Sequence, residues 1–125
     1  MVGRDFEVSI ISTPSAGKKM DGDYMEDWLN RNFRLADYGR GVEEVFVLFN
    51  TEKIDKPAQY RFHPDDQFLE LIIPLRESDL RNAGREATIL MMAVAIANTL
   101  KTIPLPAIPH FDLAAFREEL EEMIE

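Results

Sequence analysis

The chain contains no cysteine among its 125 residues. This absence excludes disulfide bonds, thiolate metal sites, iron–sulfur clusters and cysteine nucleophiles. Long apolar segments are also missing: the longest uncharged stretch, residues 87–100, is shorter than the ~20 residues that a membrane-spanning helix needs. Charged residues at positions 4, 5 and 7 interrupt the apolar core that a secretory signal peptide would require. We therefore expect a cytoplasmic protein that does not bind membranes.

Basic residues are scarce as well. The chain has 14 Lys and Arg against 23 Asp and Glu, which gives a formal net charge of −9 at pH 7. Most of this charge lies in residues 63–125, where 12 acidic residues outnumber 5 basic ones. Direct binding to nucleic acid is disfavoured, because it depends on Lys and Arg displacing counterions. A basic protein is the better-matched partner, although the same net charge also serves solubility.

Sequence motifs of common active sites are absent. The chain has no G-x-S-x-G nucleophile elbow and no H-E-x-x-H zinc motif. Residues 12–19 stand between a predicted strand and a predicted helix, but they lack the first glycine of a P-loop and the Ser or Thr that follows its lysine. The acidic residues of 21–27 do not fit the spacing of an EF-hand. We expect no cofactor and no bound metal.

Hydrophobic periodicity predicts four strands and three helices. The strands are expected over residues 4–12, 42–49, 58–62 and 67–75, with the last two forming a hairpin. The helices are expected over 20–38, 78–100 and from Asp112 to the end of the chain. This order does not repeat a strand–helix–strand unit. It predicts a small α+β fold with a mainly antiparallel four-stranded sheet packed against helices, in one domain spanning residues 1–125.

Local patterns refine these elements. The continuous apolar run 45–49 is typical of a strand buried on both faces. The nearly uninterrupted apolar stretch 87–97 predicts a central helix that is covered all round. Asp23 followed by Glu26 resembles a capping box at the start of the first helix, and Gly39 suits its C-terminal cap. At the last helix, Phe111 and Phe116 occupy the positions of a hydrophobic staple.

Two groups of residues are candidates for binding a protein partner. The first projects from one side of the first helix, where carboxylates stand beside an indole ring, a combination that suits protein interfaces. The second lies in the turn of the predicted hairpin. The candidate residues are Asp23, Glu26, Asp27 and Trp28 in the helix, and Asp65 and Asp66 in the turn. A structural interpretation stays open for both groups, because carboxylates also favour helix N-termini and aspartates also stabilise turns.

Two other classes of function are compatible with the sequence. His63 precedes Asp65 and Asp66, so a small enzyme or ligand-binding domain could use an imidazole and two carboxylates for acid–base chemistry. An accessory subunit or secretion chaperone would instead use exposed apolar surface and form a stable dimer. A discrete pocket would favour the first class, whereas a concentrated acidic face without a deep pocket favours an inhibitor.

In size, acidity, lack of cysteine and compact α+β layout, the chain resembles the immunity proteins of bacterial polymorphic-toxin and contact-dependent growth inhibition systems. The resemblance implies stoichiometric inhibition of a cognate toxin, often a nuclease, by acidic and aromatic side chains that cover its active site. Such a site must be cationic to hold phosphates, so an acidic inhibitor gains both attraction and fast association.

Overall fold

The computed structural model describes residues 5–11, 19–52, 55–76, 78–79 and 83–125. The strands are β1 (Phe6–Ile11), β2 (Glu44–Asn50), β3 (Gln59–His63) and β4 (Phe68–Pro74). The helices are α1 (Lys19–Asn32), α3 (Arg85–Lys101) and α4 (Leu113–Ile124), with short 3₁₀ helices at Leu35–Tyr38 and Leu105–Ala107. The α+β class and the four strands were therefore predicted correctly from the sequence.

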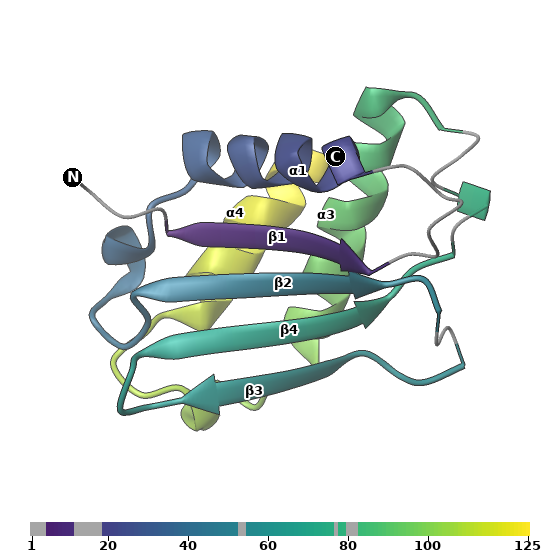
Figure 1. Cartoon of the computed structure of the whole chain (residues 1–125). Coiled ribbons are helices and arrows are strands. Elements are labelled where there is room, and N and C mark those ends of the chain that lie inside the picture. Colours follow the sequence, from purple (N-terminus) through teal and green to yellow (C-terminus); the bar gives the residue numbers. More distant parts are fainter. Residues whose placement is uncertain (1–4, 12–18, 53–54, 77, 80–82) are drawn as a thin grey trace.

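The four strands form one mixed sheet in the order β1-β2-β4-β3 (Figure 1). β1 pairs with β2 in parallel, β2 pairs with β4 in parallel, and β3 pairs with β4 antiparallel. The predicted hairpin is confirmed, but the prediction of a mainly antiparallel sheet is wrong. Two of the three strand pairs are parallel.

The connections between strands explain this difference. α1 carries the chain from the end of β1 back to the start of β2, and adjacent strands joined by such a crossover run in the same direction. The strand that follows β2 in the chain, β3, does not pair with β2 but forms the far edge of the sheet. The hairpin then places β4 between β2 and β3. Strand order is a long-range property that the periodicity of each segment does not contain.

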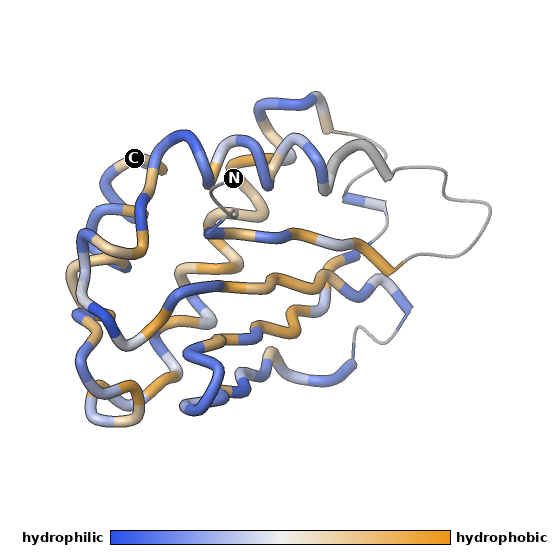
Figure 2. Tube along the Cα trace, turned by 60° about the vertical axis from the view of Figure 1, so that its left-hand side comes forward, coloured by the Kyte–Doolittle hydropathy of each residue, from blue (hydrophilic) through white to orange (hydrophobic). Residues whose placement is uncertain are grey.

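The helices cover one face of the sheet. Figure 1 shows α3 and α4 behind the strands and α1 along the edge beside β1, with no described element in front of the sheet. The inward side chains of β2 are Val45, Val47 and Phe49, and all three are buried. Figure 2 shows apolar residues concentrated along the central strands and hydrophilic residues in the turns at the ends of the sheet. Burial of this apolar layer is the main stabilising term of the fold.

One prediction for β2 is wrong. Phe46 and Leu48 are only half-buried, because they point to the face that no described element covers. The apolar run 45–49 therefore belongs to a strand that is covered on one side in the isolated chain.

The first helix differs from its predicted bounds at both ends. α1 begins at Lys19, before the expected cap at Asp23, so Glu26 does not form a capping box. α1 ends at Asn32, whereas the prediction continued to residue 38, and a separate 3₁₀ helix follows over residues 35–38. Asp5 stabilises the start of this 3₁₀ helix, because its carboxylate accepts a hydrogen bond from the Leu35 N–H (2.9 Å). Gly39 consequently follows the 3₁₀ helix and not α1.

The central helix is exposed along one side. α3 begins after Gly84, its N-cap residue, and its buried face includes Met92, Ile96 and Leu100. Leu90 and Val94 are 43% and 40% exposed, so the prediction that this helix is covered all round is wrong. No helix in the described part of the chain is both long and apolar enough to cross a membrane.

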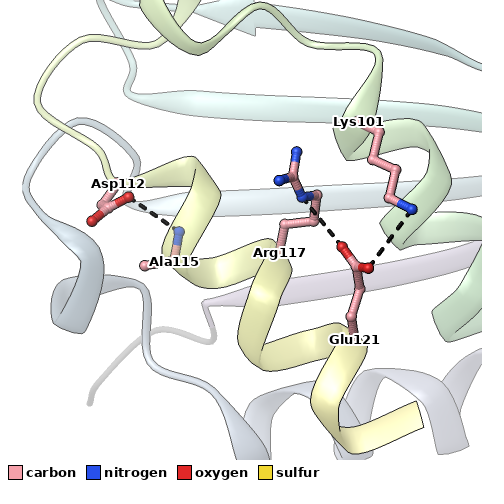
Figure 3. Close-up of polar contacts among 5 residues, drawn as sticks. All are labelled: Lys101, Asp112, Ala115, Arg117 and Glu121. Carbon is pink, nitrogen blue, oxygen red and sulfur yellow. Dashed lines mark hydrogen bonds and ion pairs between the residues drawn. The ribbon is translucent and has the colours of Figure 1, made fainter. Parts of the chain in front are cut away.

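The start of α4 follows the prediction. The Asp112 carboxylate accepts a hydrogen bond from the Ala115 N–H (3.1 Å), which Figure 3 shows as the helix cap. The rings of Phe111 and Phe116 pack edge to face with centroids 6.4 Å apart, as a hydrophobic staple requires. Both signals are local in sequence, which is why the pattern alone revealed them.

Candidate protein-binding surface

The hairpin turn between β3 and β4 lies against the segment that leads into β2. The backbone carbonyl of Gln67 accepts hydrogen bonds from the N–H groups of Glu43 (2.7 Å) and Glu44 (3.4 Å), and its side-chain amide donates to the carbonyl of Arg40. Gln67 has a φ of 51°, a left-handed conformation that residues other than glycine adopt rarely. These contacts place Asp66 of the turn next to the acidic start of β2.

The segment before β2 is also fixed against the loop that precedes α4. The N–H groups of Arg40 and Gly41 both donate to the carbonyl of His110 (2.9 Å each). A Cβ at Gly39, which has a φ of 130°, would lie 2.2 Å from the His110 oxygen, and one at Gly41 would lie 2.1 Å from the Pro109 oxygen. Both positions therefore require glycine. The close approach fixes the position of Arg40 at the corner of the sheet.

An acidic groove with a volume of about 560 Å³ results at this end of the sheet. We use the term acidic groove for this hollow, whose charged lining residues are Asp5, Arg40, Glu43, Glu44 and Asp66. Four of these five are acidic, and all except Asp5 are exposed. Like charges gathered on a concave surface strengthen the local field, so the groove attracts cationic groups of a partner. Asp65, which is also exposed, extends the acidic surface over the turn.

The candidate residues on α1 differ in their exposure. Asp23 and Asp27 are exposed, whereas Glu26 is half-buried and its carboxylate accepts a hydrogen bond from a backbone N–H of β1 (2.9 Å). Trp28 is half-buried, and its ring packs edge to face on Phe33 with centroids 5.9 Å apart. Glu26 and Trp28 thus contribute to the packing of α1, and the two aspartates provide its exposed negative charge.

The structure separates the two groups of candidate residues. Gly22 at the start of α1 lies beside Ile10, near the end of β1, so Asp23 belongs to that end of the sheet. Asp65 and Asp66 precede Phe68, which is paired with Glu44 at the beginning of β2. Because β1, β2 and β4 are parallel, these two positions mark opposite ends of the sheet. The six predicted residues therefore do not form one site.

His63 does not join the aspartates of the turn in a catalytic arrangement. Its ring stacks on Phe68 with centroids 5.5 Å apart, and its Nε2 lies 3.7 Å from Oε1 of Glu70. These contacts direct the imidazole onto the sheet, while Asp65 and Asp66 are exposed in the turn. Within the described ranges, no three His, Asp or Glu side chains are placed to hold a metal ion. Residues 12–18, the loop compared above with a P-loop, lie outside the described residues.

The acidic residues of α4 are partly engaged within the protein. Glu121 forms ion pairs with Arg117 (3.2 Å) and Lys101 (3.7 Å), which tie α4 to α3 (Figure 3). Glu119 accepts a hydrogen bond from the hydroxyl of Tyr38. The outer face of this helix therefore combines solvated charge with contacts that stabilise the fold.

Comparison with known proteins identifies the family. The model of the family Immunity protein 44 matches residues 5–125. The chain belongs to this family. No curated protein and no solved structure gives a significant match to it. The immunity protein 44 assignment confirms the resemblance to immunity proteins that size, acidity and layout indicated.

Sequence reasoning missed most of the acidic groove of this immunity protein 44 chain. Arg40, Glu43 and Glu44 were not among the candidate residues, because their relation to Asp66 depends on strand order and on the long-range contacts of Gln67. The two glycines around Arg40 were the one available signal. A Gly-x-Gly sequence immediately before a strand indicates close backbone contact there.

Proposed function

We propose that the chain binds and neutralises a basic toxin, such as a nuclease, and that it does so as a stoichiometric inhibitor that covers the toxin's active site. Membership of the immunity protein 44 family is the observation that carries this proposal, since immunity proteins act on cognate toxins. The expected site of action is the cytoplasm of the bacterium that needs protection.

The acidic groove supports a basic partner. Glu43, Glu44 and Asp66 are exposed around one hollow, and Asp65 lies beside them in the turn. A nuclease active site is cationic because it must hold phosphates, so the same acidic surface would steer association and compete with the natural substrate. We place the acidic part of the interface at this groove. Asp23 and Asp27 on α1 stay an alternative location for it.

Capture followed by an inhibition assay tests the proposal. The immobilised chain is incubated at low salt with a lysate of its source cells, and retained proteins are eluted with rising salt. We expect a basic protein in stoichiometric amount whose nuclease activity is abolished when one molar equivalent of the chain is added back. An unrelated acidic protein of similar net charge serves as the control and should not inhibit. A retained partner whose activity survives a molar excess of the chain would contradict the proposal.

A further inference from the structure

The sheet has an apolar face that the protein itself does not cover. We call this the open face; its apolar centre consists of Phe46 and Leu48 of β2 and Phe68 and Ile72 of β4. All four side chains are half-buried and none is among the residues packed on the hydrophobic core. Figure 1 looks onto this face and shows α3 and α4 on the other side of the strands, with α1 along the edge beside β1.

The four side chains form one continuous patch. The register places Leu48 directly opposite Ile72. It also places Glu44, which precedes Phe46 by two residues on the same face, directly opposite Phe68. The rings of Phe46 and Phe68 pack edge to face with centroids 6.4 Å apart. Side chains paired across neighbouring strands in this way present one surface. Glu70 lies between Phe68 and Ile72 on the same face, opposite Phe46. A partner would therefore meet connected apolar side chains with one carboxylate among them.

Parallel strands are ordinarily covered on both faces. β1, β2 and β4 are parallel to one another, yet only the face toward the helices is covered by the described chain. The apolar run of β2 has the composition of a strand with two covered faces. A single-faced parallel sheet with an apolar outer side is the arrangement expected when a second protein provides the missing layer.

The open face continues into the acidic groove. Glu44 belongs to both, because it lines the groove and is paired with Phe68 on the outer side of the sheet. Glu7 lies opposite Phe46 and adds an exposed carboxylate on the β1 side. On the β3 side, Glu70 lies 3.7 Å from the imidazole of His63 and is paired across the strands with Arg61, whose positive charge offsets that of the carboxylate. The edge shared with the groove is therefore the negative one.

From these observations we infer that the open face is the hydrophobic centre of the interface with the toxin, and that the acidic groove forms part of its rim. This inference rests on the proposed function. The occupant it specifies is a basic surface carrying apolar or aromatic side chains, which fits the common interface pattern of an apolar centre inside a polar rim. A second copy of the chain is disfavoured, because two chains of net charge −9 repel each other.

Neutral substitutions test this inference without altering charge. The double variant Leu48→Gln/Ile72→Gln makes the centre polar, and its matched control Leu90→Gln/Val94→Gln makes the same change on exposed positions of α3. The basic protein retained by the immobilised chain is the binding partner, and surface plasmon resonance measures the lifetime of the complex. We expect the open-face variant to dissociate at least tenfold faster than the unmodified chain, and the control to stay within about twofold.

A second variant guards against loss of folding. Ser9 of β1 is paired directly opposite Leu48 of β2. Ser9→Trp therefore adds a bulky side chain to the open face while removing no apolar contact. It should weaken the complex by a similar factor while thermal unfolding stays cooperative.

An unmodified chain that does not inhibit the partner overturns the proposed function. An unmodified chain that inhibits, with open-face variants of equal lifetime, overturns only this inference. Sedimentation of the unmodified chain as a dimer, and of Leu48→Gln/Ile72→Gln as a monomer, would assign the face to a second copy and overturn it as well.

Discussion

At the scale of single residues, Tyr38 makes the stability of the protein decrease at alkaline pH. Tyr38 is buried, and its hydroxyl donates a hydrogen bond to the Glu119 carboxylate. Burial first, and then the hydrogen bond and negative charge of Glu119, raise the pKa of this phenol above its ordinary value of 10.0. The folded state therefore holds this proton more tightly than the unfolded chain does. Its contribution to stability is fully present below pH 10 and is lost as the pH rises beyond it.

We predict that Tyr38→Phe lowers the free energy of unfolding by about 1 kcal/mol at pH 7, the usual size of a lost hydrogen bond. Above pH 10 the difference from the unmodified chain should shrink, because that chain then loses the stabilisation while the variant has no phenol at position 38 to ionise. Urea denaturation at neutral pH and at several alkaline pH values measures both effects. Glu119→Gln keeps an acceptor but removes the charge, so it should show a weaker pH dependence. A constant difference between Tyr38→Phe and the unmodified chain at every pH would contradict this assignment.

The residues that could be predicted from the sequence are those whose role is local. The cap formed by Asp112 and the staple of Phe111 and Phe116 are contacts between near neighbours in the chain. Gln67 and Gly39 have roles set by residues far away in the sequence. Their importance for the acidic groove became visible only when the turn, the segment before β2 and the loop before α4 were placed together.

At the scale of elements, helix α1 closes the outer edge of the sheet. Asn30 accepts a hydrogen bond from the Phe6 N–H (3.0 Å) and donates one to the Phe6 carbonyl (2.9 Å), as a neighbouring strand would. The Glu26 carboxylate accepts a hydrogen bond from the N–H of Val8, two residues further along the same edge of β1 (2.9 Å). An exposed strand edge is a template for pairing with other chains, and these side chains occupy that template on β1.

We predict that Asn30→Ala lowers the free energy of unfolding by about 2 kcal/mol, because it leaves both backbone groups of Phe6 without these partners in a half-buried position. Asn32→Ala is the matched control. It gains the same helix propensity, but Asn32 is exposed and, among the described residues, its side chain bonds only to the Trp28 carbonyl of its own helix (2.7 Å). Its cost should therefore stay below about 1 kcal/mol. Urea denaturation of both variants measures the difference. Equal effects at the two positions would show that the edge contacts do not stabilise β1.

The elements themselves were largely predictable, whereas their arrangement was not. Alternation and turn residues indicated β3 and β4 and the hairpin between them, because these patterns reflect one face of one strand. The parallel pairing of β2 with β4 depends on a choice between two places in the sheet, which no local pattern records. The apolar stretch of α3 was interpreted as complete burial, yet Leu90 and Val94 are exposed. Composition gives the amount of apolar surface and leaves open which side is covered.

At the scale of the whole molecule, charge and apolar surface have separate roles in binding. A net charge of −9 acts over distances of about a Debye length, roughly 10 Å at 0.1 M salt, and so affects how fast a basic partner arrives. The open face acts only on contact and so affects how long the partner stays. The two groups of acidic candidates occupy opposite ends of the sheet, a separation that the sequence could not show because it depends on the parallel order of the strands.

Two charge-reversed variants decide which end meets the partner. Asp65→Lys/Asp66→Lys and Asp23→Lys/Asp27→Lys change the net charge by the same amount at exposed positions, so any difference between them reports location. We predict that the turn variant associates at least tenfold more slowly with the captured basic protein at low salt, and the α1 variant only about threefold more slowly. Stopped-flow measurements should show this difference disappearing near 0.5 M salt, where charges are screened within roughly 4 Å.

Equal slowing would mean that association responds to total charge alone, and stronger slowing by the α1 variant would move the interface to Asp23 and Asp27. Because the open face adjoins the turn through Glu44, only the predicted outcome is consistent with one surface on which charge guides the partner and apolar contact retains it.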